Sequence, residues 1–219
     1  MKFKNLKRDL KLSPYAPEWD FTLGFSEVNS IDLGTLYSTI LKKERVIKKL
    51  PLSKVYNSEN FTDGYTGLGK NSTTSRFQHY NVFDWNTKET NQLKIEISRS
   101  LVKYNNFLDN KIPQNLWINC WVNILRFGQH ITPHLHSVKE DCYLSGHFVV
   151  NSKNTSTVYI NPVNQIMDPE VVKVENKAGE MTIFPSYVPH YTTKHYSFKP
   201  RVTIAFDICL EKYNSSVLL

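Results

Sequence analysis

The segment LWINCWVNILRF, residues 116–127, decides the fold class of this chain. It is rich in β-branched and aromatic residues, Pro113 precedes it and Gly128 follows it, as is typical of a β-strand. From Pro113 onward the apolar residues keep recurring with a period of two. We therefore predict strands at residues 116–127, 142–151, 157–160, 171–175, 180–184 and 201–210.

The first half of the chain follows a different period. In residues 32–50 and 87–108 the apolar side chains recur every three or four positions, which predicts two amphipathic helices. Between them, DGYTGLGKNSTTSRF (residues 63–77) is rich in Gly, Ser, Thr and Asn and predicts a loop. Helices followed by strands predict a helical layer packed on an antiparallel double sheet.

The expected fold is therefore mostly β with flanking helices: a double-stranded β-helix, or cupin-like jelly roll, with an N-terminal helical layer. A chain of 219 residues can bury a full core, and we expect a single domain over residues 1–219. Residues 1–111 form its helical and loop-rich support, and residues 112–212 form the jelly-roll core.

Composition excludes several classes of protein. The chain is 40% hydrophobic and 21% charged, which excludes disordered and fibrous architectures. Its three cysteines are widely spaced and make neither a zinc pattern nor a closed set of disulfides. The net charge of +7 is concentrated in residues 1–11, which we interpret as a solvated basic terminus and not as a nucleic-acid surface. No apolar run is long enough for a signal peptide or a membrane span, so we expect a cytoplasmic protein with no membrane partner; its oligomeric state stays open.

Three of the seven histidines are placed where they can meet. His134 and His136 lie two positions apart, so in extended backbone their imidazoles point to the same side. His190 follows two prolines, Pro185 and Pro189, which restrict the backbone that presents it. Imidazole suits Fe, Zn, Cu and Ni, and three protein ligands leave coordination positions open. The alternative is a pair of half-exposed histidines on a turn.

A cation in an apolar strand is the second unusual feature. Arg201 opens RVTIAF, where a buried guanidinium needs a carboxylate as its partner. Thr203 lies two residues on, on the same strand face, and can donate a hydroxyl hydrogen bond to that carboxylate. The carboxylate can belong to a ligand or to an Asp or Glu of the chain itself.

The order of these motifs resembles the iron(II)/2-oxoglutarate-dependent oxygenases. His134-Leu135-His136, His190 after 56 positions, and then Arg201 with Thr203 follow that family's order of ligands and cosubstrate anchor. The similarity extends to NILRFGQHITPHLH (123–136), LSGHFVV (144–150) and GEMTIFPSYVPH (179–190), and it covers roughly residues 60–210. The chain is similar to oxygenases of marine bacteria and their phages, which are relatives of the prolyl-hydroxylase branch.

This resemblance implies a set of roles. His134, His136 and His190 would bind Fe(II), and Arg201 with Thr203 would hold the distal carboxylate of 2-oxoglutarate. Asn123 and Tyr159, on strands expected to face inward, are candidates for the C1 end of 2-oxoglutarate or for the substrate, or are buried polar core residues. The implied activity is an Fe(II)- and 2-oxoglutarate-dependent dioxygenase, an oxidoreductase. It would use O2 to hydroxylate an amino-acid or peptidyl carbon, prolyl being the first choice, with release of succinate and CO2.

His136 departs from the family pattern, because most members carry a carboxylate there. Three interpretations stay open: a three-histidine site, a two-histidine site completed by water, or a ligand from Glu140 or Asp141. Three competing functions also stay open. They are a three-histidine thiol dioxygenase of the cupin type, a non-catalytic metal-binding or nucleic-acid-binding module, and a zinc-binding jelly roll.

Overall fold

The computed structural model describes residues 1–8, 14–15, 18–53, 71–136, 141–163, 171–213 and 215–219. Most of the predicted loop over residues 63–77 lies outside this part of the chain. Within it the helices are α1 (Leu33–Ile47) and α2 (Lys88–Phe107), with short 3-10 helices η2 (Thr74–Arg76) and η3 (Val82–Trp85). The strands are β1 (Lys2–Lys7), β2 (Asp20–Glu27), β3 (Trp117–Leu125), β4 (Cys142–Asn151), β5 (Ser156–Ile160), β6 (Val171–Glu175), β7 (Glu180–Pro185), β8 (His190–Thr192), β9 (Arg201–Cys209) and β10 (Val217–Leu218).

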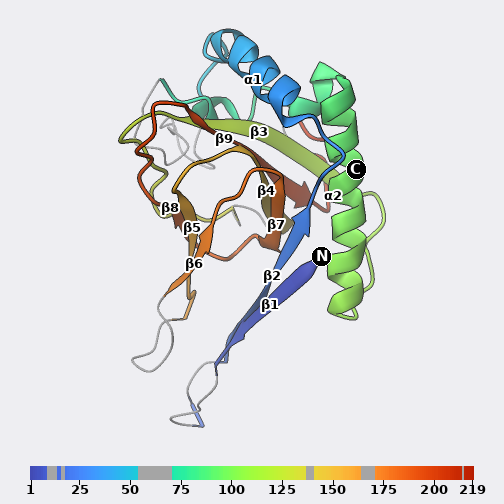
Figure 1. Cartoon of the computed structure of the whole chain (residues 1–219). Coiled ribbons are helices and arrows are strands. Elements are labelled where there is room, and N and C mark those ends of the chain that lie inside the picture. Colours follow the sequence, from blue (N-terminus) through green and yellow to red (C-terminus); the bar gives the residue numbers. More distant parts are fainter. Residues whose placement is uncertain (9–13, 16–17, 54–70, 137–140, 164–170, 214) are drawn as a thin grey trace.

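The described strands form two antiparallel sheets, which confirms the predicted mostly-β, jelly-roll fold class. The larger sheet has the order β1-β2-β7-β4-β9-β3-β10, and the smaller sheet has the order β6-β5-β8. Helices α1 and α2 lie along the outer side of the larger sheet, and the smaller sheet lies away from them (Figure 1). The larger sheet therefore has one face toward the helices and another toward the smaller sheet.

The prediction that helices come first in the chain was wrong. The hairpin of β1 and β2 precedes α1 and joins the larger sheet through pairing of β2 with β7. The segment KFKNLK alternates exposed polar side chains with half-buried Phe3 and Leu6. Lysines on an edge strand also discourage pairing with another chain. Part of the basic terminus is thus an edge strand, with Lys2, Lys4 and Lys7 exposed.

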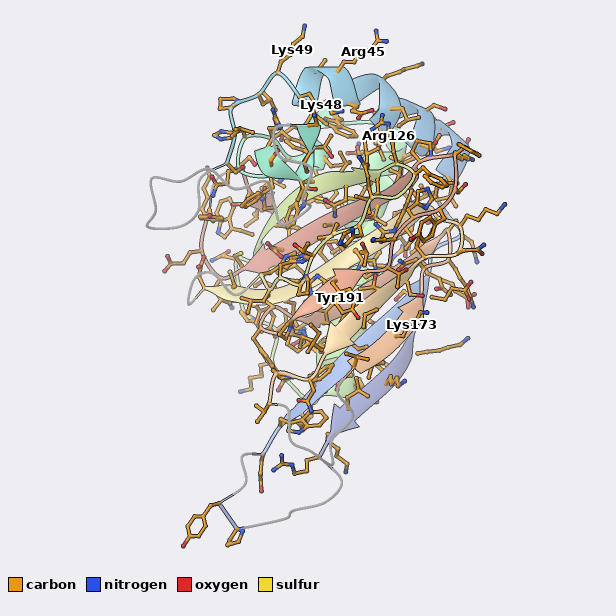
Figure 2. All side chains as sticks on the ribbon, turned by 90° about the vertical axis from the view of Figure 1, so that its left-hand side faces the viewer. Arg45, Lys48, Lys49, Arg126, Lys173 and Tyr191 are labelled. Carbon is orange, nitrogen blue, oxygen red and sulfur yellow. The ribbon has the colours of Figure 1, made fainter. Side chains whose placement is uncertain are left out.

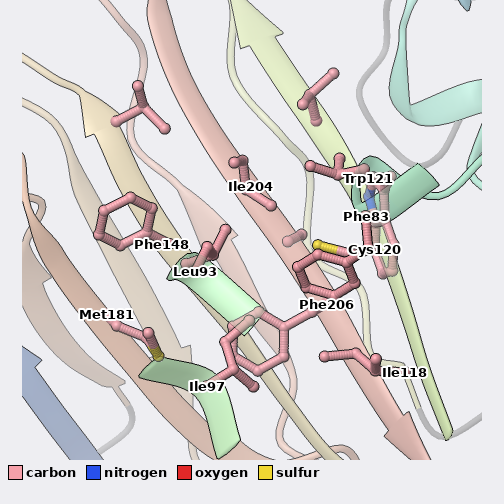
Figure 3. Packing of buried hydrophobic residues seen from close by; sticks show 14 of the residues in the cluster. Phe83, Leu93, Ile97, Ile118, Cys120, Trp121, Phe148, Met181, Ile204 and Phe206 are labelled. Carbon is pink, nitrogen blue, oxygen red and sulfur yellow. The ribbon is translucent and has the colours of Figure 1, made fainter. Parts of the chain in front are cut away.

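The helix-covered face of the larger sheet holds the main hydrophobic core. Leu93 and Ile97 of α2 are fully buried there, among Phe148, Met181 and Phe206 of three neighbouring strands (Figure 3). Full burial of each such side chain contributes about 1.5–3 kcal/mol to folding. This contact fixes α2 on the sheet and leaves the opposite face free for other chemistry.

Close approach of the strands requires a glycine at one position of this core. A Cβ added to Gly146 would lie 2.3 Å from Phe206 Cζ and 2.4 Å from the carbonyl oxygen of Thr182. The second atom belongs to the backbone and cannot move aside like a flexible side chain. Strand β4 therefore needs glycine here to lie between β7 and β9.

Helix α1 carries a buried carboxylate on the outer side of the molecule. Asp32 begins the helix by accepting hydrogen bonds from the backbone of Gly34 and Thr35. Glu44 makes a bidentate ion pair with Arg126 at 2.9 and 2.7 Å and a second pair with Lys48 at 2.7 Å. Lys48 and Arg126 lie together at the end of this helix (Figure 2).

In the described part of the chain, no helix has the length and apolar character needed to span a bilayer.

Candidate functional site

Polar side chains line the inner face of the larger sheet because its strands alternate. Val202, Ile204 and Phe206 of β9 face the helices, and the intervening residues face the smaller sheet. Strand pairing places β3 and β4 residues directly opposite them, so the inner face gathers a largely polar surface that also contains Trp121, Val149 and Ala205. Its polar members are Asn123, Ser145, His147, Arg201, Thr203 and Asp207.

The three predicted histidines come together beside this surface. His134 and His190 exchange backbone hydrogen bonds of 3.0 and 2.9 Å, and the His136 amide donates to the Ser186 carbonyl at 3.1 Å. One ligand atom from each imidazole lies within 4.8 Å of the others. The ring centroids are 4.4 to 5.2 Å apart. Main-chain bonds between the two segments thus hold all three rings in one place.

Each ring uses Nδ1 for a hydrogen bond to an oxygen acceptor. His134 Nδ1 lies 2.9 Å from the Thr132 carbonyl, and His190 Nδ1 lies 3.0 Å from the Val188 carbonyl. His136 Nδ1 lies 2.6 Å from Asp207 Oδ1. A carbonyl oxygen only accepts, so the hydrogen resides on Nδ1 of His134 and His190. Nε2 of each neutral ring then offers a lone pair, which is the arrangement of a metal-ligating histidine.

Burial favours the neutral form of two of these rings. Together with the neighbouring histidines it lowers the pKa of His134 to about 3 and that of His190 well below its ordinary value. For His136 burial again acts to lower the pKa, but the Asp207 carboxylate more than offsets it, so the pKa is raised. A cluster of buried imidazoles with nitrogen donors fits Fe(II) as well as other borderline metals.

Arg201 lies at the other end of the polar surface and has no acidic partner among the described residues. Only 2% of the residue is exposed, and no described carboxylate forms an ion pair with it. Its Nη1 lies 3.4 Å from Thr203 Oγ1, and its Nε makes no hydrogen bond to a described residue. The Asn176 amide oxygen, turned toward Arg201, accepts from Nη2 at 3.2 Å. The alternative of an internal Asp or Glu partner is therefore not found in the described residues, and a ligand carboxylate fits this position.

Asn123 and Tyr159 lie on either side of this region. Asn123 pairs across the strands with Thr203, and its side-chain oxygen accepts from the Thr74 hydroxyl. Tyr159 of β5 is fully buried with its ring 5.9 Å from that of His190. Its hydroxyl makes no hydrogen bond within the described part of the chain. Tyr159 can therefore donate to a ligand, whereas Asn123 is already partly engaged.

Four further residues of the site were not predicted as such. Trp121 stacks on His136 with ring centroids 5.6 Å apart, and its buried indole N–H meets no acceptor among the described residues. His147 of β4 faces the same surface. Asp207 and Ser145 form hydrogen bonds behind His136. Alternation along β9 from Arg201 would have placed Asp207 on the inner face.

The carboxylates considered as substitutes for His136 differ in position. Asp141 is not in the group of possible metal ligands that the described residues form, and that group consists of the three histidines alone. Glu140 lies outside the described residues. Within the described part of the chain, His136 is the third donor beside His134 and His190.

The comparisons with known proteins agree with this geometry. Residues 119–207 match the family model described as "Putative 2OG-Fe(II) oxygenase", and this range includes every candidate residue above. A comparison with curated proteins gives no match.

Solved structures share the fold at low identity. A prolyl-4-hydroxylase from Pseudomonas putida is 13% identical with a TM-score of 0.54, covering 85% of this chain and 92% of its own. A prolyl hydroxylase from Trichoplax adhaerens, in complex with a hypoxia inducible factor peptide fragment, is 12% identical with a TM-score of 0.51 and coverages of 85% and 83%. AviO1 from Streptomyces viridochromogenes is 12% identical with a TM-score of 0.53 and coverages of 89% and 93%.

The family match covers the three histidines, the buried arginine and the polar face between them. Residues 119–207 thus match a 2OG-Fe(II) oxygenase family model, and this match together with the three-histidine group indicates an oxidoreductase with Fe(II) and 2-oxoglutarate as cofactors.

Proposed function

We propose that the protein hydroxylates a carbon of an amino acid or peptide, with prolyl as the first substrate to test, and releases succinate and CO2. Arg201 carries the proposal, because a buried guanidinium without an acidic partner among the described residues is costly unless an anion joins it. The distal carboxylate of 2-oxoglutarate is such an anion. The two prolyl hydroxylases of the same fold motivate the choice of substrate.

Each residue then has a defined task. His134, His136 and His190 hold Fe(II) through Nε2, while their Nδ1 atoms keep the rings oriented. Arg201 binds the distal carboxylate with two or more N–H groups, Thr203 donates its hydroxyl, and Tyr159 offers a second hydroxyl from the facing sheet. Fe(II) with 2-oxoglutarate supplies the activation of O2, one oxygen atom going to succinate and the other to the hydroxylated product.

Aromatic side chains pack against the histidines and shield them from water. Phe184 packs edge-on against His190 with ring centroids 4.8 Å apart, and Trp121 covers His136. Apolar walls around the donors raise the strength of every electrostatic contact inside. They also keep O2 activation away from solvent in the absence of substrate.

A small cavity lies at the edge of the smaller sheet, outside the group of candidate site residues. Its volume is about 160 Å³, and it lies between the β1–β2 hairpin and the strands β5 and β6. Trp19 and Phe21 form an aromatic wall that belongs to the same cluster as Tyr159. Asn161 lines the cavity with a buried side-chain N–H that no described residue accepts, and such a donor suits a carbonyl or carboxylate oxygen.

The competing three-histidine thiol dioxygenase would pair Arg201 with the single carboxylate of a thiol-bearing amino acid. That reaction takes no 2-oxoglutarate and forms no succinate, so succinate formation separates the two enzymes. A zinc-binding or non-catalytic module forms no succinate either.

Turnover tests the proposal directly. The Fe(II)-loaded protein is incubated with 2-oxoglutarate, O2 and panels of free amino acids and proline-containing peptides, and succinate is quantified by NMR. A true substrate increases succinate formation and gains the mass of one oxygen atom. Arg201→Met should abolish both signals at low 2-oxoglutarate, while the matched control Arg126→Met, which breaks a pair on the outer side, should retain them. Oxygen consumption without succinate would contradict the proposal.

A further inference from the structure

A buried carboxylate supports only one of the three histidines. His134 and His190 give their Nδ1 hydrogens to backbone carbonyls, which are neutral. His136 instead faces Asp207, with 2.6 Å between Nδ1 and Oδ1. The Asp207 side chain is 17% exposed, and His136 is the only described cationic or titratable nitrogen with which it pairs. Of the three histidines, only His136 has a carboxylate at its Nδ1 atom.

A chain of hydroxyl groups fixes Asp207. Ser145 Oγ lies 2.7 Å from Asp207 Oδ1 and 2.9 Å from Ser186 Oγ. The Ser145 hydroxyl has the geometry of a donor toward both oxygens, so its single hydrogen is shared between Asp207 and Ser186. The Ser186 carbonyl in turn accepts the backbone N–H of His136. These contacts join β9, β4 and the segment after β7 around the His136 imidazole.

We propose that Asp207 is a positioning residue that orients His136 as an Nε2 ligand through the hydrogen bond at the His136 Nδ1 atom. The inference rests on the proposed function. A carboxylate hydrogen-bonded to a ligating histidine fixes the tautomer and raises the basicity of the ligand. His136 and Asp207 thus act together: His136 offers Nε2 to the metal, and Asp207 holds the imidazole in place from the other side of the ring.

Metal affinity measured on the intact protein tests this assignment. The probes are Co(II) alone, followed by absorbance, and Fe(II) alone under anaerobic conditions. Asp207→Asn should weaken both affinities by about tenfold to 100-fold. Glu44→Gln is the matched control, because it also removes a buried, ion-paired carboxylate but lies on the outer side, and it should bind both metals like the wild type.

A second readout separates positioning from general stability. In the Co(II) form, each Nδ1 hydrogen should give one solvent-exchangeable, strongly shifted proton resonance, and Asp207→Asn should displace or remove one of three. In the His136→Asp background there is no imidazole to orient, so adding Asp207→Asn should leave the affinity unchanged or tighten it. If Asp207→Asn does not fold, Ser145→Ala serves instead and should weaken binding by about threefold to tenfold.

Two failures can be told apart. A wild-type protein that binds neither Co(II) nor Fe(II) overturns the proposed function. A wild-type protein that binds metal, together with an Asp207→Asn variant of equal affinity or an equal loss in the His136→Asp background, overturns the role of Asp207 alone.

Discussion

Replacing Arg201 by methionine should have opposite effects on the stability of the ligand-free protein and on its affinity for 2-oxoglutarate. Burial lowers the pKa of Arg201 to about 10. Against its ordinary value, this corresponds to a cost of about 3 kcal/mol for keeping the charge buried. Methionine fills most of the same volume without the charge. We therefore expect the free energy of unfolding of the ligand-free variant to rise by about 1–3 kcal/mol.

The loss of affinity follows from the contacts that Arg201 can make. Its Nε has no partner among the described residues, and its Nη1 holds Thr203 only at 3.4 Å, so the guanidinium has donors left for a carboxylate. A hydrogen bond between charged groups contributes about 1.5–3 kcal/mol. The variant should therefore bind 2-oxoglutarate roughly tenfold to 150-fold more weakly, with Fe(II) affinity largely kept.

Urea unfolding of the metal-free protein and anaerobic calorimetry with Fe(II) and 2-oxoglutarate measure the two effects. Arg126→Met is the control, because it leaves Glu44 with one cation fewer and should destabilise the fold without changing 2-oxoglutarate affinity. An Arg201→Met protein that unfolds at lower urea and still binds 2-oxoglutarate like the wild type would refute the reasoning, since Arg201 would then be an internal structural partner.

Three other changes test separate parts of the structure. His134→Ala and His190→Ala should each abolish Fe(II) binding with the fold intact by circular dichroism, and stoichiometric iron in both variants contradicts the metal site. Gly146→Ala should destabilise the protein by about 1–3 kcal/mol in urea unfolding, because its Cβ meets the backbone of β7, and unchanged stability contradicts the close approach of β4 to β7. Burial, with Arg201 and His136 adding to the shift, lowers the pKa of His147 to about 3. Below about pH 6.5 this histidine therefore binds a proton in the unfolded chain but stays neutral in the folded chain. Stability of the metal-free protein should thus fall as pH drops from about 6.5 toward 3, and His147→Gln should reduce that slope by up to about 1.4 kcal/mol per pH unit; an unchanged slope contradicts a neutral buried His147.

The spacing of apolar residues along the sequence predicted the core strands well but did not predict the N-terminal hairpin of β1 and β2. The predicted ranges 142–151 and 171–175 coincide with β4 and β6, which are rich in β-branched or aromatic residues. Strand β1 has only Phe3 and Leu6 as apolar residues between polar ones, and the lysines that mark an exposed edge also suggest an unstructured basic tail. Strand β8 has three residues, too few for any period to show.

The candidate metal ligands could be proposed from sequence, but their supporting residues could not. His134 and His136 stand two apart in the chain, and the proline-rich turn before His190 marks it as special. Asp207 lies 71 positions after His136, and only the pairing of β9 with β4 brings it beside Ser145. Contacts of this kind depend on strand register, which a single sequence does not determine.

An anaerobic titration of the wild-type protein with Fe(II) and 2-oxoglutarate tests the central claim most directly. We predict one Fe(II) per chain, and a visible charge-transfer band that appears only when Fe(II) and 2-oxoglutarate are both present. In Arg201→Met the same band should require a higher concentration of 2-oxoglutarate, and in His134→Ala it should be absent. Fe(II) binding by the wild type without any band at saturating 2-oxoglutarate would contradict the assignment of this site to a 2-oxoglutarate-dependent oxygenase.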